Sequence, residues 1–182
     1  MIWKIIAWIV SRPIVATWLI ERAKKTPYSH IAKNGDVYME RYWVFNPYQR
    51  GEHGQERSKY PWFPWNIRIH WIRRPDQDRH MHDHPWNART IILKGGYVEQ
   101  RIVGSVLYDG QGNVISDETH QKYFTRPTGA TSKIGFGMYH RITQIQAGGA
   151  WTLFISGPYQ GTWGFLVDGV KVQWRKYLGL EK

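Results

Sequence analysis

Arg79-His80-Met81-His82-Asp83-His84-Pro85-Trp86 is the most informative segment of the chain, because it places three histidines at alternate positions. In an extended strand successive side chains point to opposite faces, so His80, His82 and His84 are expected to share one face. Same-face neighbours lie about 6.5 Å apart at the backbone, which lets two imidazoles reach one metal ion at about 2.0–2.1 Å each. A third ligand must come from another strand, and His140 is the best candidate.

The composition excludes several kinds of site. The 182 residues include no cysteine, which rules out a disulfide framework, a cysteine-ligated zinc, an iron–sulfur cluster and a thiol nucleophile. Any metal must therefore be held by histidine, aspartate or glutamate. With 42% hydrophobic and 21% charged residues the chain is globular, and its length favours a single domain.

The chain is strongly basic, with 25 Lys and Arg against 14 Asp and Glu and a formal charge of +11. Such a charge is typical of proteins that bind nucleic acid, a membrane surface or small anions, and it also keeps an aromatic-rich protein in solution. The basic residues occur singly and in pairs, and no specific nucleic-acid-binding motif is present. We therefore expect dispersed solubilising charge, with one or two arginines that face a small anionic molecule.

The first 25 residues are apolar and are interrupted near the middle. Apart from Lys4 and Arg12, residues 1–20 are uncharged. The sequence Ser11-Arg12-Pro13 predicts a break between two helices, with Ser11 as the N-cap of a second helix that runs to about Lys25. The uninterrupted apolar pieces are too short to span a bilayer.

Two interpretations of this segment stay open. It is either a pair of short helices packed on the main domain, which we favour, or an interfacial helix on a membrane surface with Trp3, Trp8 and Trp18 at headgroup level. The expected organisation is a helical segment over residues 1–30 and a β-barrel domain over residues 31–182.

The remainder of the chain predicts an all-β domain. Short aromatic and β-branched segments alternate with turn residues about every 8 to 12 positions, as in a sandwich or barrel. Ile67–Arg73 alternates apolar and polar residues, as a half-buried strand does. The other expected strands are Asp36–Phe45, His80–His84, Thr90–Leu93, Tyr97–Leu107, Tyr123–Arg126, Lys133–Gly135, His140–Gln146, Trp151–Ser156, Gly164–Val167 and Val170–Trp174. Turns are expected at Gly95-Gly96, Asp109–Asn113 and Asp168-Gly169, and Asn46–Trp65 is expected to be a loop.

The segment that begins at the histidines resembles the first sequence motif of the cupin superfamily. It has His82-x-His84, then four residues, Arg89, six residues and Gly96. The spacing agrees with the motif throughout, but Arg89 stands where the family carries a glutamate ligand.

The second histidine segment resembles the second cupin motif. It reads Gly135-x-Gly137-x2-His140-x3-Gln144, with Gly135 in place of the family's proline and Gln144 in place of its asparagine. The resemblance covers about residues 65–165. It implies a mainly β fold, the cupin-type double-stranded β-helix or jelly-roll barrel, here with one or two N-terminal α-helices.

The missing glutamate makes the site similar to that of the thiol dioxygenases, cupins that hold Fe(II) with three histidines. This resemblance implies a divalent metal ion, Fe(II) first, at the three histidines, and Zn, Mn or Ni also suits imidazole ligands. Those enzymes also carry a Ser-x-His-x-Tyr relay, and this chain has Trp151, Leu153 and Ile155 at the corresponding positions. We therefore expect the metal site without cysteine oxidation.

The chain also resembles cupin-like proteins of unassigned function encoded by bacteriophages and bacteria, in the segments HMHDHPWNARTIILKGGY and GTWGF. This likeness implies a cytoplasmic protein of a bacterial or phage-infected cell. Cupins often dimerise by exchanging strands, so the resemblance also implies a homodimer.

Five residues are candidates for binding the substrate. A guanidinium binds a carboxylate or phosphate through two hydrogen bonds, so Arg89 is expected to hold a small anionic molecule beside the metal. Arg141 and Tyr97 would help to position this molecule, and Trp151 would contact it. Glu99 is a candidate carboxylate ligand or general base.

Two functions remain open. The first is a non-haem Fe(II)-type oxygenase acting on a small anionic molecule. The second is a non-catalytic cupin-like protein that sequesters a nucleotide-like or other anionic metabolite. Near the site, His80 is expected to lie outside the ligand set and Asp83 to face away from its two histidine neighbours.

Overall fold

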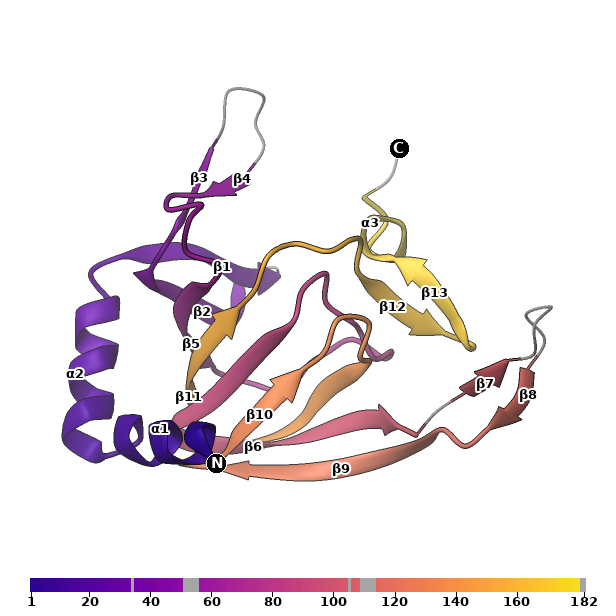
Figure 1. Ribbon diagram of the computed structural model, residues 1–182, viewed down its shortest axis with the longest axis horizontal. Helices are drawn as coiled ribbons and strands as arrows, with labels where there is room; N and C mark the ends of the chain where they lie inside the picture. Colours follow the sequence, from indigo (N-terminus) through magenta and orange to yellow (C-terminus); the bar gives the residue numbers. More distant parts are fainter. Residues whose placement is uncertain (34, 51–55, 105, 109–113, 181–182) are drawn as a thin grey trace.

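The computed structural model describes residues 1–33, 35–50, 56–104, 106–108 and 114–180. Its main feature is a curved antiparallel sheet with the strand order β1-β2-β5-β11-β6-β10, to which β9 is added beside β6 (Figure 1). The strands of this sheet are β1 Pro27–Lys33, β2 Asp36–Phe45, β5 Asn66–Ile72, β6 Ala88–Val103, β9 His120–Pro127, β10 Thr131–Ile134 and β11 His140–Ser156. The prediction of a mainly β fold is confirmed.

Three smaller hairpins project from the sheet. They are β3 Tyr48–Arg50 with β4 Glu56–Ser58, β7 Val106–Tyr108 with β8 Val114–Asp117, and β12 Gly164–Val167 with β13 Val170–Gln173, which is followed by the short helix α3 Trp174–Tyr177. The last hairpin turns at Asp168-Gly169 as expected, with a positive φ of 49° at Asp168. The first hairpin lies within the expected loop Asn46–Trp65, whereas the expected turn at Asp109–Asn113 lies outside the described residues.

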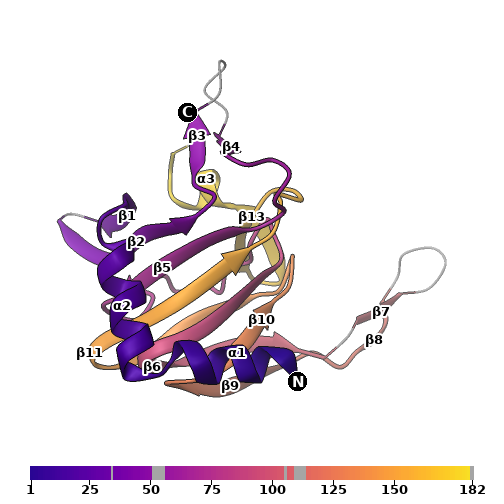
Figure 2. The same ribbon diagram turned by 60° about the vertical axis from the view of Figure 1, so that its left-hand side comes forward.

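Two helices form a second layer on one face of the sheet, which we call the helix face (Figure 2). They are α1 Ile2–Val10, over β6 and β10, and α2 Pro13–Ala23, over β2, β5 and β6. Small and branched side chains let the helices approach closely, and the shared core is Ala7, Ala16, Ile20, Ala23, Tyr42, Ile69, Ile91, Leu93 and Leu153. Packing on the main domain, one of the two interpretations of this segment, is therefore observed.

The helix boundaries differ in detail from those expected. Arg12, in an extended conformation, is the N-cap residue of α2, and Ser11 instead ends α1. Pro13 does occupy the first turn. An N–H in that turn has no acceptor within the helix, so proline costs the helix no hydrogen bond there. The chain enters β1 at Pro27, so the last residues of the expected helical segment 1–30 are strand.

β6 continues through the turn that was expected at Gly95-Gly96, and β11 likewise joins two expected strands. Gly95 has a φ of +75°, and a Cβ there would lie 2.1 Å from the carbonyl oxygen of Gly149, so glycine permits a close approach of the two paired strands. Trp151 pairs with Lys94 and Thr152 pairs with Ile92, which leaves a bulge at Leu93.

This bulge has a consequence for the site, because it reverses which residues face which side. Before it, Ile91 packs on the helices while Ile92 faces the opposite side of the sheet, which we call the inner face. After it, Tyr97 packs beside Ile92 on the inner face, and Glu99 follows two residues later.

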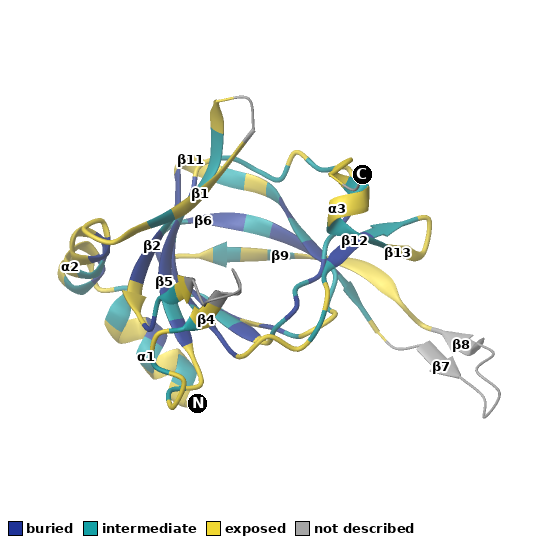
Figure 3. Cartoon of the chain, turned by 90° about the horizontal axis from the view of Figure 1, so that it is seen from above, coloured by how far each residue is buried: buried dark blue, intermediate teal, exposed yellow. Residues whose placement is uncertain are grey.

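β5 is covered on both sides, in contrast to the half-buried strand predicted. Ile67 and Ile69 face the helices, and Ile69 is fully buried there. The polar residues Arg68 and His70 face inward and are 4% and 7% exposed. Buried residues gather where β5, β6 and β11 lie side by side (Figure 3), so the polar face of this strand meets the interior instead of water.

Candidate metal centre

His82, His84 and His140 converge at one point. One ring nitrogen from each lies within 4.8 Å of those from the other two, and no other such metal-binding group occurs among the described residues. The Nε2 atoms of His84 and His140 are 2.9 Å apart. The sequence therefore identified all three members of the cluster correctly.

The backbone brings the two histidine segments together. His82 and His140 exchange hydrogen bonds, each N–H donating to the other's carbonyl oxygen at 3.0 Å. His82 also bridges to Phe165 of β12, but its segment forms only these two isolated bridges and not the strand expected over His80–His84. Alternation still holds locally, since His84 points the same way and Asp83 the other.

The geometry of the cluster fits a divalent metal ion. Two ligands each about 2.0–2.1 Å from one ion, and at right angles to one another, would be about 3 Å apart. The 2.9 Å between the Nε2 atoms of His84 and His140 matches that arrangement. Three imidazoles with no thiolate suit Fe, Zn, Mn or Ni, and three ligands leave coordination positions open.

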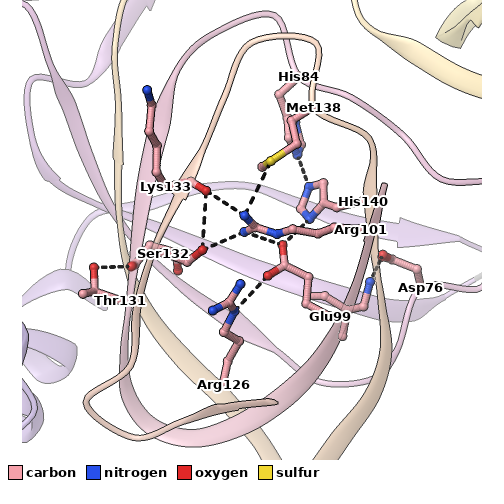
Figure 4. Close-up of polar contacts among 12 residues, drawn as sticks. Asp76, His84, Glu99, Arg101, Arg126, Thr131, Ser132, Lys133, Met138 and His140 are labelled. Carbon is pink, nitrogen blue, oxygen red and sulfur yellow. Dashed lines mark hydrogen bonds and ion pairs between the residues drawn. The ribbon is translucent and has the colours of Figure 1, made fainter. Parts of the chain in front are cut away.

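Glu99 orients His140 from behind (Figure 4). Its Oε1 lies 2.8 Å from Nδ1 of His140, so Nδ1–H donates to the carboxylate and the lone pair is left on Nε2, toward the other histidines. Glu99 is 1% exposed and does not join the ligand group, so its expected roles as a metal ligand or substrate-binding base give way to that of a positioning residue.

Two arginines hold Glu99 in its ionised form. Arg101 Nη2 lies 2.8 Å from Oε1, and Arg126 Nε lies 3.0 Å from Oε2. Burial alone would raise the pKa of Glu99, but the hydrogen bond from His140 and the charges of His140 and Arg101 outweigh it and lower the pKa to about 2. A permanent negative charge therefore lies behind His140, which raises the basicity of the ring as a ligand.

The other two histidines are kept neutral. Desolvation, and then the nearby His140, lower the pKa of His82 to about 4. Desolvation and the same neighbour also lower the pKa of His84 well below its usual value. Metal ligation requires the unprotonated imidazole, so both rings are in the binding form at neutral pH.

Aromatic rings surround the cluster. Trp86 stacks on His84 with ring centroids 4.4 Å apart and 8° between the planes, and it meets Phe154 edge-on at 5.2 Å. Phe165 and Trp163 lie on the other side, 5.9 and 6.4 Å from His82. These rings fix the imidazoles and limit the access of water to them.

The two neighbours of the ligands lie as expected. His80 is outside the cluster, with its Nδ1 3.0 Å from the hydroxyl of Tyr177. Asp83 faces away, accepts a hydrogen bond from the N–H of Gly164 at 2.7 Å and pairs with Lys171 at 2.6 Å. Asp83 therefore fastens the β12–β13 hairpin beside the histidines.

Arg89 does not face the histidines, which corrects its expected role. It lies on the helix face, with its guanidinium 4.7 Å from the ring of Trp3 and Nη1 donating to Thr131 Oγ1 at 3.3 Å. Alternation along β6 instead turns Ala88 inward, against Phe154 and Ile134. The inward position beside Arg89 therefore carries an alanine, which supplies no ligand.

Three other substrate candidates also lie elsewhere. Tyr97 is buried in the inner core, where burial and then the charge of Glu99 raise its pKa. Arg141 turns away from the cluster and donates to Gln100 Oε1 at 2.6 Å. Trp151 lies on the helix face and stacks on Trp71 at 5.0 Å. Each lies close to a residue of the site in sequence or in space. Strand alternation or core packing nevertheless directs each side chain away from the histidine cluster.

Sequence reasoning missed four site residues: Arg101, Arg126, Arg68 and His70. Arg101 and Glu99 are two apart in one strand, so alternation could have paired them. Arg68 and His70 were assigned to a solvent-facing side because IRIHWIR alternates, and no local signal reveals that the interior lies on their side. His70 Nε2 is buried and makes no hydrogen bond within the described part of the chain.

Comparison with known proteins gives likenesses at the level of the fold. No protein-family model matches the chain, and no curated protein sequence does either. Among solved structures, Fe(II) HppE is similar with 13% identity over 74% of this chain and 57% of that one, at a TM-score of 0.45. Hydroxypropylphosphonic acid epoxidase from S. wedmorenis has 14% identity over 66% and 51% of the chains, at a TM-score of 0.40.

A structure of Bacillus subtilis oxalate decarboxylase with Mn(II) centres has 14% identity over 87% of this chain and 33% of that one, at a TM-score of 0.46. The chain thus spans little more than half the length of the HppE chains it matches. Because every TM-score is below 0.5, the likenesses assign neither activity nor substrate to this chain.

Proposed function

We propose that this chain is a metal-binding cupin that holds one divalent ion, Fe(II) in its working form, and acts as a non-haem oxygenase. The observation that carries the proposal is the cluster of His82, His84 and His140, with its nitrogens within 4.8 Å of one another. An ion bound there would offer its remaining coordination positions to O2 and to a substrate.

The chain's own residues prepare this site. The two neutral histidines present lone pairs without first releasing a proton. Glu99 keeps the proton of His140 on Nδ1, at 2.8 Å, and so keeps Nε2 available. Arg101 and Arg126 in turn keep Glu99 charged. Each ligand is thus held in its binding form by a neighbour, as a resident metal requires.

A small anionic molecule is the proposed substrate, and Arg68 takes the role first expected of Arg89. Its guanidinium is 4% exposed on the inner face, and Nη2 donates to Ser156 Oγ at 3.0 Å. The guanidinium lies 5.3 Å from the ring of Phe154, and Phe154 in turn meets Trp86, which stacks on His84. Arg68 and the buried Nε2 of His70 together suit a carboxylate or phosphate group.

Metal analysis of untagged protein tests the proposal directly. We expect about one equivalent of Fe, or of a competing divalent metal, in the wild-type chain, and a loss of about tenfold or more in His84→Gln. His80→Gln is the matched control, because that histidine lies outside the cluster. Equal metal content in the two variants would reject the site.

Sequestration of an anionic metabolite is the second candidate. It is favoured by the 2.9 Å contact between His84 and His140, which one N–H can satisfy as a hydrogen bond without any metal. It is also favoured by Ala88, which faces inward beside Arg89 and supplies no ligand. An oxygen electrode distinguishes the two functions. The oxygenase consumes O2 with its substrate, whereas the sequestering protein releases an unchanged ligand after denaturation.

A further inference from the structure

The two N-terminal helices present a second apolar side to solvent. The sides that carry Ala7, Ala16 and Ile20 are buried against the sheet. On the opposite sides, Ile5, Trp8, Ile14 and Trp18 are 52%, 59%, 86% and 64% exposed. Large apolar side chains gathered in this way on a soluble surface mark an interaction site more often than chance exposure does.

These side chains form one surface. Both helices lie against the same face of the sheet (Figure 2), so the sides turned away from the sheet point in a common direction although the axes are bent by 78°. We call this surface the outward helix face. It comprises Ile2, Ile5, Trp8, Ile9, Ile14 and Trp18. A shallow depression lined by Pro13, Ile14, Thr17 and Trp18 continues it over α2.

The charges around the outward helix face are predominantly positive. Residues 1–30 contain five Lys and Arg and one acidic residue, Glu21, which pairs with Lys24 at 2.7 Å. The guanidinium of Arg12 lies 4.0 Å above the ring of Trp8. An indole beside a cation is suited to the headgroup level of a bilayer, where one end of the pair is apolar and the other is hydrated.

From these observations we propose that the outward helix face binds the surface of an anionic lipid bilayer. The apolar side chains enter the headgroup boundary and the surrounding cations meet the lipid phosphates. No single helix in the described ranges passes the length and hydropathy test for a membrane span, although α1 and α2 pass it together as a bent pair. The helices pack against β2, β5, β6 and β10 through their other side, which favours lying on the membrane over crossing it.

The proposal is independent of the metal centre, because the histidines lie on the inner face of the sheet. Vesicle flotation of the full chain tests it. We expect the protein to float with phosphatidylcholine–phosphatidylglycerol vesicles and to remain unbound with phosphatidylcholine alone. Lys4→Gln with Arg12→Gln should weaken binding by about fivefold per cation removed.

Separating this contact from general attraction of a basic protein requires a variant with unchanged charge. Ile5→Gln with Trp8→Gln and Trp18→Gln keeps the net charge and the buried helix side, and should abolish flotation. The matched control, Tyr159→Gln with Val170→Gln and Leu180→Gln, removes similarly exposed apolar groups elsewhere and should bind like wild type. Urea unfolding of all variants reports whether the fold is intact.

Two results would overturn the proposal. Unchanged flotation of the Ile5, Trp8 and Trp18 variant would mean that charge alone attracts the protein. Absence of flotation in the wild type, with a dimer on size exclusion that the same variant converts to monomer, would mean that the outward helix face binds a second copy of the chain.

Discussion

Glu99 shows how one buried residue determines the state of the site. It accepts a hydrogen bond from His140 and is paired with two arginines, so it fixes a tautomer, a ring orientation and a charge. The sequence pointed to Glu99 as a carboxylate ligand or general base and missed its orienting role, because that role depends on which face of β6 Glu99 occupies. That face is set by the bulge at Leu93, which no local pattern reveals.

Glu99→Gln should lower metal affinity by about 10- to 100-fold. The amide retains an acceptor for His140 but removes the negative charge and leaves Arg101 and Arg126 without their counter-ion. Competition with a chelator measures the affinity, and urea unfolding measures the accompanying loss of stability. Glu118→Gln, at an exposed position, is the control. An unchanged metal affinity in Glu99→Gln would contradict the orienting role.

At the scale of the element, the close pairing of β6 and β11 positions the site. The strands were predicted in four pieces because glycine pairs usually mark turns. Gly95 instead lets the backbone of Gly149 lie close to it, because glycine has no Cβ. Glycine here therefore lies within a continuous strand and not in a turn. The hairpin at Asp168-Gly169 was predicted correctly because its turn chemistry acts locally. The close approach of Gly95 and Gly149, in contrast, depends on residues more than fifty positions apart.

Gly95→Ala should therefore lower the free energy of unfolding by about 3 kcal/mol or more, because a Cβ meets backbone as well as a strained φ. Gly148→Ala is a matched control, since Gly148 has a φ of +85° but no atom within 4 Å of the added Cβ. That variant should lose only about 1 kcal/mol. Urea denaturation of both chains makes the comparison, and equal losses would show that the close approach is unimportant.

At the scale of the whole molecule, the sheet has covered surfaces on both sides. Helices cover one face with apolar contacts, and the inner face buries histidines and arginines. Sequence patterns predicted the mainly β class and the convergence of the three histidines, because these follow from short-range patterns and spacing. They could not place Arg68 or His70, since burial of a polar strand face depends on what folds over it.

Burial of neutral histidines predicts how stability depends on pH. The pKa of His82 is lowered to about 4, and burial, with Arg68 and Arg41, lowers the pKa of His70 well below its usual value. Between about pH 6.5 and pH 4 the unfolded chain therefore binds protons that the native chain does not, so stability falls as pH falls, by about 1.4 kcal/mol per pH unit for each such proton.

Urea unfolding in the presence of a chelator measures this slope without the contribution of bound metal. His70→Gln removes one of the protons that the unfolded chain takes up, so the slope of unfolding free energy against pH should fall by about 1.4 kcal/mol per pH unit. A wild-type stability that stays level from about pH 6.5 to pH 4 would be inconsistent with buried neutral histidines.

The metal centre is tested most directly by anomalous diffraction at the iron edge from crystals loaded with Fe(II) without oxygen. The geometry of His82, His84 and His140 predicts a single peak between the three rings, about 2.0–2.2 Å from one nitrogen of each. A peak elsewhere, or none between these histidines while His84 and His140 keep their 2.9 Å contact, would contradict the proposed centre.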